Sequence, residues 1–239
     1  MTTRVAMWSG PRNLSTAMMR SFGARADCTV VDEPFYAAYL ASTGLDHPGR
    51  EAVLASQPTD PATVVAEVTG VTGAPVPTPL QYQKQMTHHL TGGIDLDGLA
   101  GLTHAFLVRD PARVLTSYAK VRDEPTLEDL GLPQQVALFE RFGGPVVDAA
   151  DVLADPRATL TALCAALGIA FDEAMLTWEP GPRDTDGVWA PWWYAGVEAS
   201  TGFGAAPGAA DPLPPRLEPL LERCLPYYET LAPHRIRTD

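Results

Sequence analysis

Lysine is scarce in this sequence, and its scarcity limits where lysine chemistry can occur. Lys84 and Lys120 are the only lysines among 17 Lys and Arg residues. The 29 acidic residues outnumber the basic ones, and the formal net charge is −12. So acidic a chain is unsuited to non-specific binding of nucleic acid or of anionic membranes. Any anionic ligand must therefore be held by a local cluster of positive charge.

Cysteine is also scarce, and long apolar runs are missing. Cys28, Cys164 and Cys224 are odd in number and lie far apart, which excludes a disulfide framework and the paired spacing of a zinc site. No stretch approaches the ~18 apolar residues of a membrane-spanning helix, and the first ten residues lack a secretory pattern. We expect a soluble, cytoplasmic protein without a metal site, either a monomer or a homodimer.

Apolar runs alternate with helical periodicity along the 239 residues, of which 46% are hydrophobic. This alternation predicts an α/β fold: a single P-loop-type three-layer domain over residues 1–239, with a central parallel sheet of about five strands and helices on both faces. The expected strands are Arg4 to Trp8, Cys28 to Val31, Leu80 to Lys84, His104 to Val108, and Pro145 to Val147.

Helix starts are marked by capping residues and proline. Helices are expected from Ser15 to Gly23, from Asp110-Pro111 to about Arg122, and from Asp155-Pro156 to Gly168. Four of the five tryptophans fall between residues 178 and 193, beside a Gly/Pro-rich loop. We interpret residues 178–215 as an aromatic lid and linker, and residues 216–232 as a C-terminal helix.

Charged residues follow several predicted strands. In a parallel sheet the carboxyl ends of the strands share one edge, where ligands bind. Glu33 and Arg109 each follow a predicted strand, Lys84 ends one, and Arg12 lies in the loop after the first strand. This set is suited to binding and reacting with an oxyanion.

The loop after the first strand is a candidate anion site. A helix that starts after a loop rich in Gly, Ser and Thr presents unpaired N–H groups and the positive end of its dipole. The Walker pattern fails here, because Leu14 precedes Ser15 where that motif has lysine. Alternatively, Ser15 only caps the helix. Arg109, with Ser117 eight residues later, could clamp a second phosphate. The loop residues are Ser9, Gly10, Pro11, Arg12, Asn13, Leu14, Ser15 and Thr16.

Together, the loop and the segment from Phe106 to Tyr118 resemble the sulfotransferases that use 3′-phosphoadenosine 5′-phosphosulfate (PAPS). The likeness continues in residues 151–168, and it is greatest to bacterial and fungal sulfotransferase-like proteins, some of which carry a branched-chain aminotransferase label. The resemblance implies transfer of a sulfuryl group to a hydroxyl or amine of a small-molecule acceptor. It also implies that Arg12, Ser15 and Thr16 bind the 5′-phosphosulfate, and that Arg109 and Ser117 bind the 3′-phosphate.

Sulfuryl transfer needs a base for the acceptor proton and positive charge near the leaving phosphate. Glu33 resembles the glutamate base of bacterial carbohydrate sulfotransferases, although a helix cap or a solvated loop charge is the alternative. Lys84 and Arg12 are candidates for stabilising the leaving oxygen. The position of the catalytic histidine of animal cytosolic sulfotransferases holds Met86, so His88 is the reserve base.

The remaining site candidates lie in the tryptophan-rich segment. Arg183 matches, in a loose alignment, a basic residue that reaches the 3′-phosphate in the family. Trp189, Trp192, Trp193 and Tyr194 are interpreted either as a stacking surface for adenine or acceptor, or as core.

Three other functions are consistent with parts of the sequence. The first is a nucleotide kinase or hydrolase that uses ATP and magnesium, with Asp110 or Asp148 at the metal, although these acids are better explained as a helix cap and a strand-end residue. The second is a protein that binds a 3′-phosphonucleotide without turnover. The third is a pyridoxal phosphate enzyme with its Schiff base on Lys84 or Lys120.

Overall fold

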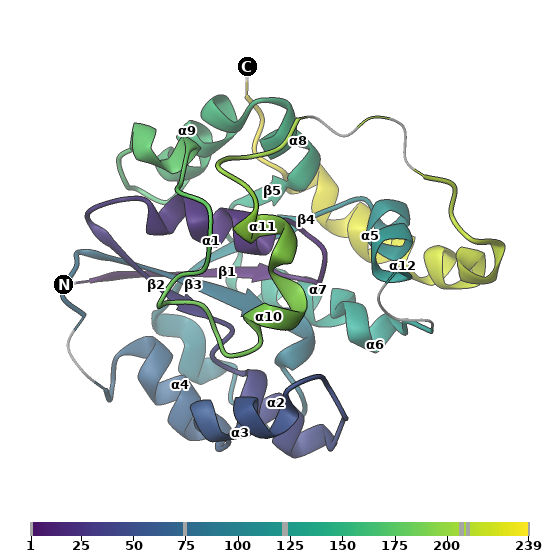
Figure 1. Cartoon of the computed structure of the whole chain (residues 1–239), viewed down its shortest axis with the longest axis horizontal. Coiled ribbons are helices and arrows are strands. Elements are labelled where there is room, and N and C mark those ends of the chain that lie inside the picture. Colours follow the sequence, from purple (N-terminus) through teal and green to yellow (C-terminus); the bar gives the residue numbers. More distant parts are fainter. Residues whose placement is uncertain (1, 74–75, 121–123, 206–207, 209–210, 239) are drawn as a thin grey trace.

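Five parallel strands form one sheet in the order β2-β3-β1-β4-β5 (Figure 1). The computed structural model describes residues 2–73, 76–120, 124–205, 208 and 211–238. The predicted parallel α/β sheet is confirmed, and each predicted strand differs from the observed one by two residues or fewer at either end. The strands are β1 (Thr3–Ser9), β2 (Cys28–Asp32), β3 (Leu80–Met86), β4 (Thr103–Val108) and β5 (Val146–Asp148).

Helices cover both faces of this sheet. On one face α1, α8 and α9 pack against β1, β3, β4 and β5, and on the other face α4, α7 and α12 do so (Figure 1). The helices are α1 (Ser15–Gly23), α2 (Tyr36–Thr43), α3 (Arg50–Ser56), α4 (Pro61–Thr69), α5 (Pro111–Tyr118), α6 (Leu127–Leu130), α7 (Leu132–Phe142), α8 (Ala149–Ala154), α9 (Pro156–Ala166), α10 (Ala190–Trp193), α11 (Ala195–Glu198) and α12 (Glu218–Leu231).

The central strand β1 is buried on both of its faces. Val5 and Met7 pack into one hydrophobic cluster, Ala6 and Trp8 pack into the other, and none of the four is exposed. A strand covered on both faces consists of a continuous apolar run, which is why residues 4–8 show no alternation. Because β1 cannot move without disturbing both clusters, the loop that follows it has a rigid base.

Acidic side chains cap the helices α5, α8 and α9. Asp110 accepts hydrogen bonds from the first-turn N–H groups of α5, and Asp148 and Asp155 do the same for α8 and α9. The predicted α5 is too long. It ends at Tyr118 instead of near Arg122, because the chain turns at Ala119 and Lys120, and Arg122 lies outside the described residues.

The C-terminal third contains short helices and one long one. The segment from Trp178 to Phe203 holds α10 and α11 and crosses in front of the sheet, and α12 occupies the region predicted for the last helix (Figure 1). Within the described residues no helix has the length and apolar character that a membrane span requires. The described part of the chain also contains no cluster of three or more side chains suited to holding a metal ion.

Candidate active site

A cavity of about 610 Å³ lies at the carboxyl edge of the sheet. It extends from the loop between β1 and α1 to α2, and residues of the Trp178–Phe203 segment form its outer wall. Most of the site residues predicted from the sequence line it, namely Pro11, Arg12, Asn13, Leu14, Ser15, Thr16, Glu33, Lys84, His88, Arg109 and Ser117. The residues predicted from the strand ends therefore line one common cavity.

The loop after β1 leaves the start of α1 open. Ser15 does not cap this helix: the capping position is Leu14, which has no side-chain hydrogen bond to the first turn. Leu14 (φ 68°) and Arg12 (φ 61°) both adopt the left-handed conformation, which is unusual for side chains of this size. Buried Asn13 holds the loop to the Leu107 carbonyl, while its Oδ1 atom has no partner among the described residues. The N–H groups of the first turn are thus available to an anion.

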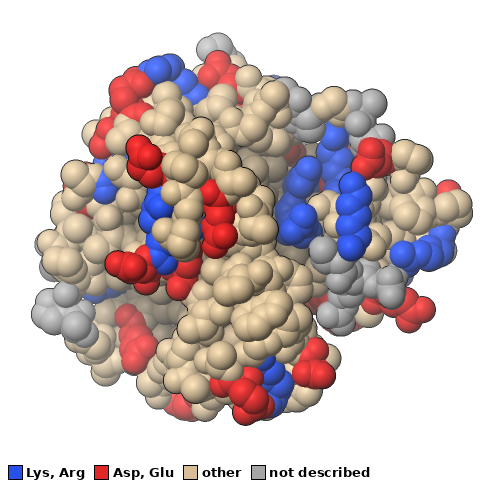
Figure 2. All heavy atoms as spheres, viewed as in Figure 1, with Lys and Arg blue, Asp and Glu red and all other residues tan. Residues whose placement is uncertain are grey.

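Positive charge gathers beside this loop. Arg12 Nε donates to Ser117 Oγ at 3.0 Å, and Arg109 donates to the Arg12 carbonyl at 2.6 Å. Burial, followed by the charges of Arg113 and Arg12, lowers the pKa of Arg109. These guanidinium groups therefore repel one another, and a bound anion would relieve the repulsion. Figure 2 shows Lys and Arg side chains grouped over the region of α5.

The first two predicted loop residues, Ser9 and Gly10, do not line the cavity. Ser9 is fully buried at the end of β1, and its carbonyl accepts a hydrogen bond from Thr87. A Cβ atom at Gly10 would lie 2.6 Å from the Leu130 carbonyl oxygen. Gly10 therefore allows the backbone to pass close to α6, and its role in this structure is packing.

Opposite the basic residues lies a buried ion cluster. Lys84 Nζ is 2.5 Å from Glu33 Oε1 and 3.0 Å from Asp32 Oδ1, and all three side chains are nearly inaccessible to solvent. Neighbouring residues of a strand normally point to opposite faces of a sheet. Glu33 has a φ of 43°, which breaks this alternation and lets both carboxylates reach the same ammonium group. The alternative that Glu33 is a solvated loop charge is wrong.

Tyr194 completes the cluster from the outer wall. Its hydroxyl donates to Asp32 at 2.8 Å and accepts hydrogen bonds from Lys84 and from Trp189 Nε1. Asp32 also accepts from the backbone N–H of Gly187 at 2.9 Å. An ammonium group has three hydrogens, and those of Lys84 are matched by Asp32, Glu33 and Tyr194. In this arrangement Lys84 holds the two carboxylates in place.

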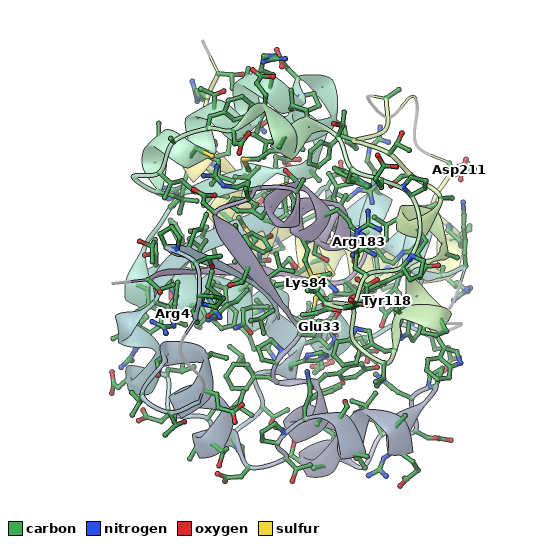
Figure 3. All side chains as sticks on the ribbon, turned by 60° about the vertical axis from the view of Figure 1, so that its left-hand side comes forward. Arg4, Glu33, Lys84, Tyr118, Arg183 and Asp211 are labelled. Atoms are coloured by element: carbon green, nitrogen blue, oxygen red, sulfur yellow. The ribbon has the colours of Figure 1, made fainter. Side chains whose placement is uncertain are left out.

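The cluster contains one more carboxylate than it has cations, and Glu33 is affected most. Burial raises the pKa of Glu33, and the charge of Lys84 opposes that rise only in part. Burial alone would lower the pKa of Lys84, but the two carboxylates raise it, so its ammonium stays charged. Figure 3 shows Glu33 and Lys84 together near the centre of the molecule. A carboxylate with a raised pKa in a cavity is a candidate general base.

Both histidines after β3, the predicted reserve base His88 and its neighbour His89, line the cavity. They lie in a short 3₁₀ turn, Thr87–His89. His89 is nearer to Glu33, with its Nε2 atom 3.8 Å from Glu33 Oε2. Burial, followed by the charges of His88, His47 and Lys84, holds the pKa of His89 well below its ordinary value. His89 is therefore a neutral ring at physiological pH.

The tryptophan-rich segment is anchored to the domain at two points. Trp189 and Tyr194 are buried, and Tyr194 joins the ion cluster, while Trp192 is 47% exposed. Arg20 and Asp186 form a buried bidentate ion pair at 2.5 and 2.7 Å. In this structure the segment is a fixed wall of the cavity.

Arg183 is not brought into the cavity. Its guanidinium donates to backbone carbonyls of its own loop, including those of Pro182 and Glu179, and Arg183 is absent from the described residues that line the cavity. The predicted contact with a 3′-phosphate would require this loop to rearrange.

Asp32 and His89 had no role in the sequence prediction, and Tyr194, which was predicted as a stacking or core residue, instead joins the ion cluster. Asp32 had a usable signal, since it directly precedes Glu33 at a strand end. Tyr194 is 162 residues away from Asp32 along the chain, and no local pattern connects the two.

Similar proteins carry the same domain. The family described as "Sulfotransferase domain" matches residues 3–235. Two Arabidopsis thaliana proteins, named branched-chain-amino-acid aminotransferase-like proteins 1 and 2, are 39% and 37% identical to the chain over 232 residues. These residues are 95% of this chain and 41% of each relative, so the chain spans about two-fifths of the length of these proteins.

Solved structures show the same fold at low sequence identity. The sulfotransferase domain of the Synechococcus PCC 7002 olefin synthase aligns with a TM-score of 0.56 at 18% identity, covering 97% of this chain and 96% of the other. A sulfotransferase from Alicyclobacillus acidocaldarius aligns with a TM-score of 0.55 at 14% identity, covering 99% and 98%. With the family match over nearly its whole length, the chain belongs to the sulfotransferase domain family.

Proposed function

We propose that this chain transfers a sulfuryl group from PAPS to a hydroxyl or amine of a small-molecule acceptor. One observation carries the proposal. The same 610 Å³ cavity is lined at one end by the open start of α1 with Arg12, Arg109 and Ser117, and at the other by the buried pair of Glu33 and Lys84. An anion site and a candidate base thus face a common space of a size suited to a nucleotide and a small second substrate.

The residues at the basic end fit the two phosphate groups of this donor. The uncapped N-terminus of α1 and the side chain of Arg12 suit the 5′-phosphosulfate, which forms hydrogen bonds to backbone N–H groups. Arg109 and Ser117 lie together across the loop and suit a separate 3′-phosphate. The lysine through which a Walker loop binds ATP has no counterpart here, which favours PAPS over ATP with magnesium.

The residues around the cavity have separate roles in the proposed reaction. Glu33 takes the proton from the acceptor hydroxyl or amine as the acceptor oxygen or nitrogen bonds to sulfur. The bond from sulfur to the bridging phosphate oxygen breaks, and that oxygen keeps the electron pair. Arg12 and the N–H groups at the start of α1 stabilise the charge that develops on the 5′-phosphate. Lys84 and Asp32 keep Glu33 oriented toward the cavity.

Calorimetric titration with 3′-phosphoadenosine 5′-phosphate, the product of the donor, tests this assignment. We expect micromolar or tighter binding, and affinity at least about 100-fold lower for 5′-AMP, since loss of a charged group from its partners is worth roughly 1.5–3 kcal/mol per hydrogen bond. ATP with magnesium is the comparison ligand. If ATP with magnesium bound more tightly than the bisphosphate, the donor assignment would be wrong.

A further inference from the structure

The hydroxyl of Tyr194 lies where the outer wall of the cavity meets the ion cluster. It donates to Asp32 at 2.8 Å and accepts hydrogen bonds from Lys84 Nζ and, at 3.1 Å, from Trp189 Nε1. The same Lys84 ammonium lies 4.6 Å from the centroid of the Tyr194 ring and 2.5 Å from Glu33 Oε1. Tyr194 therefore contacts both of the residues that hold Glu33 in place.

The outer wall supplies two donors to Asp32 and keeps both in place. The second donor is the backbone N–H of Gly187, at 2.9 Å. A Cβ atom at Gly187 would overlap the ring of Trp189, so glycine allows this close approach. Trp189 is itself 1% exposed, and its ring packs edge-on against Tyr36 with centroids 5.1 Å apart. The Tyr194 hydroxyl thus comes from a well-packed part of the wall.

The charges around Glu33 make its ionisation depend on such donors. The titratable groups that face it are Asp32 of β2, Tyr36 of α2, Lys84 of β3, His89 of the turn after β3, and Tyr194 of the outer wall. Lys84 carries the one positive charge of this set, and two carboxylates share it. Burial lowers the pKa of His89 and raises the pKa of both tyrosines, so these three side chains are neutral. Each hydrogen bond to a carboxylate therefore affects whether Glu33 holds a proton.

We propose that Tyr194 is a positioning residue of the proposed reaction: its hydroxyl holds Asp32 against Lys84 and thereby keeps Glu33 ionised and facing the cavity. The inference rests on the proposed function, in which Glu33 takes the acceptor proton. Without the hydroxyl, Asp32 loses one of its donors and one hydrogen of Lys84 loses its acceptor. The surplus negative charge of the cluster is then less stabilised, and Glu33 binds a proton more readily.

Tyr194→Phe tests this role, because it removes the hydroxyl and keeps the ring beside the Lys84 ammonium. The titration of Glu33 is followed by carbon-13 NMR of protein labelled at the glutamate carboxyl carbons, and the Glu33 resonance is identified by its absence in Glu33→Gln. We expect the midpoint to rise by about one pH unit, the effect of roughly one hydrogen bond to a charged group. The acid limb of kcat should move by the same amount, with the KM for PAPS changed less than about twofold.

Asp32→Asn should move the same midpoint in the opposite direction. The charge of Asp32 raises the pKa of Glu33, so its removal leaves Glu33 as the single carboxylate beside Lys84. We expect the midpoint to fall by about one pH unit or more. The amide keeps the size of the side chain, and its oxygen can still accept from Lys84. A purely structural role for Tyr194 and Asp32 would not produce shifts of opposite sign.

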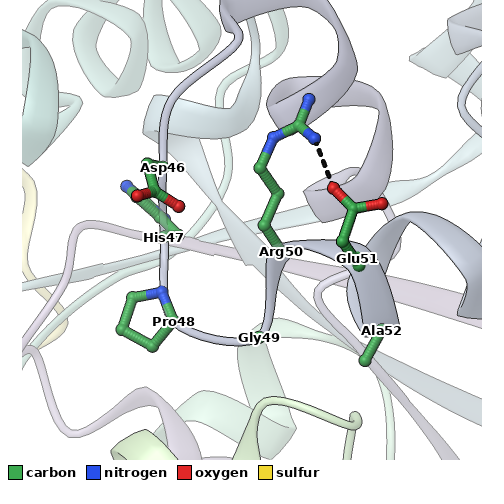
Figure 4. Close-up of a pocket in the computed structure, with 7 residues that line it drawn as sticks. All are labelled: Asp46, His47, Pro48, Gly49, Arg50, Glu51 and Ala52. Atoms are coloured by element: carbon green, nitrogen blue, oxygen red, sulfur yellow. Dashed lines mark hydrogen bonds and ion pairs between the residues drawn. The ribbon is translucent and has the colours of Figure 1, made fainter.

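Two variants outside the cavity are the matched controls. Tyr228→Phe removes a similar hydrogen bond, since the Tyr228 hydroxyl donates to Asp148 at 2.7 Å, and Tyr228 is absent from the described residues that line the cavity. Glu51→Gln removes a carboxylate from a separate surface hollow of about 510 Å³, where Glu51 pairs with Arg50 at 2.9 Å (Figure 4). Neither control should change the Glu33 midpoint measurably.

A Glu33 midpoint that stays in place or falls in Tyr194→Phe would overturn the positioning role, and so would an equal rise in Tyr228→Phe. If Tyr194→Phe does not fold, Asp32→Asn decides, and a midpoint that fails to fall overturns the role. Binding of 3′-phosphoadenosine 5′-phosphate is measured first on the same preparations. If the bisphosphate binds and the midpoints do not move, only the positioning inference fails. If it does not bind the wild type, the proposed function fails, and the role of Tyr194 in the reaction fails with it.

Discussion

Replacing both Arg109 and Ser117 with alanine is expected to weaken binding of 3′-phosphoadenosine 5′-phosphate by at least about 100-fold while changing 5′-AMP affinity by less than about threefold. Hydrogen bonds to a charged group are worth roughly 1.5–3 kcal/mol each, and this variant removes two of them along with a positive charge. The measurement is calorimetric titration of both ligands into both proteins.

Arg113 provides the matched control for this variant. It lies on the same helix, α5, contributes positive charge next to Arg109, and is absent from the residues that line the cavity. Arg113→Ala should weaken binding of 3′-phosphoadenosine 5′-phosphate only about twofold to threefold, because its charge acts through solvent. Added salt should reduce this effect further. Equal losses for both nucleotides in the double variant would contradict the assignment, because the side chains would then be supporting the loop instead of binding a 3′-phosphate.

Glu33→Gln is expected to lower kcat about 10²- to 10⁴-fold, the usual contribution of a general base, while binding of 3′-phosphoadenosine 5′-phosphate is retained. Glutamine keeps the size of the side chain but cannot take the acceptor proton. Steady-state rates and calorimetry on the same preparation separate the two effects. Full activity in this variant would remove Glu33 from the mechanism and return His88 or His89 to consideration. Loss of binding together with activity would indicate a structural role.

The pKa of Glu33 sets the expected pH dependence. Because burial raises this pKa above its ordinary value of 4.5, activity should fall as the pH is lowered through a midpoint above 4.5. Stability should change in the opposite sense. The folded state holds the Glu33 proton more tightly than the unfolded state, so ionisation of Glu33 costs stability that is absent well below pH 4.5 and grows as the pH rises through the folded pKa. The Tm of Glu33→Gln minus the Tm of the wild type should therefore be larger at pH 8 than at pH 4.5.

The ion cluster around Lys84 lowers the stability of the folded protein. Two carboxylates share one ammonium, and the backbone at Glu33 is in the left-handed region. Strained backbone and surplus buried charge both lower stability, and they occur together where a side chain must be held ready to bind a proton. The hydrogen bonds from Tyr194 and Gly187 to Asp32 offset part of this cost.

The environments of the two lysines also bear on the pyridoxal phosphate alternative. A Schiff base forms from an unprotonated amine. Lys84 has its pKa raised by Asp32 and Glu33 and stays protonated, and Lys120 is a surface residue paired with Asp211 at 2.9 Å. The environment of Lys84 does not favour the neutral amine, and Lys120 is absent from the described residues that line the cavity. The names of the Arabidopsis relatives are therefore a poor guide to the chemistry of this domain, which corresponds to only 41% of their length.

The parts of the site that follow from the order of the strands were predictable from the sequence. Glu33 and Arg109 lie just after β2 and β4, and parallel strands bring such ends to one edge. Lys84 was predicted to end its strand, but β3 continues to Met86 and Lys84 lies inside it. Arg109, just before α5, and Ser117, near the end of α5, both hydrogen-bond to Arg12. Local patterns of this kind depend on neighbouring residues alone.

The rest of the site depends on contacts that local patterns do not encode. The clustering of Asp32 with Glu33 arises from a single positive φ, which alternation along a strand would exclude. Tyr194 reaches Asp32 only because the Trp178–Phe203 segment folds across the sheet and is fixed by Arg20 and Asp186. For Arg183 the resemblance predicted a contact with the 3′-phosphate. In the structure its guanidinium instead donates to a backbone carbonyl of its own loop.

We propose that this protein transfers a sulfuryl group and not a phosphoryl group. The most direct measurement is to incubate the wild-type protein with sulfur-labelled PAPS, or with ATP labelled in its terminal phosphate plus magnesium, together with phenol and amine acceptors, and to count label in the acceptor. We expect label transfer from PAPS alone, and loss of that transfer in Glu33→Gln. Transfer or release of phosphate from ATP, with PAPS left intact, would contradict this proposal.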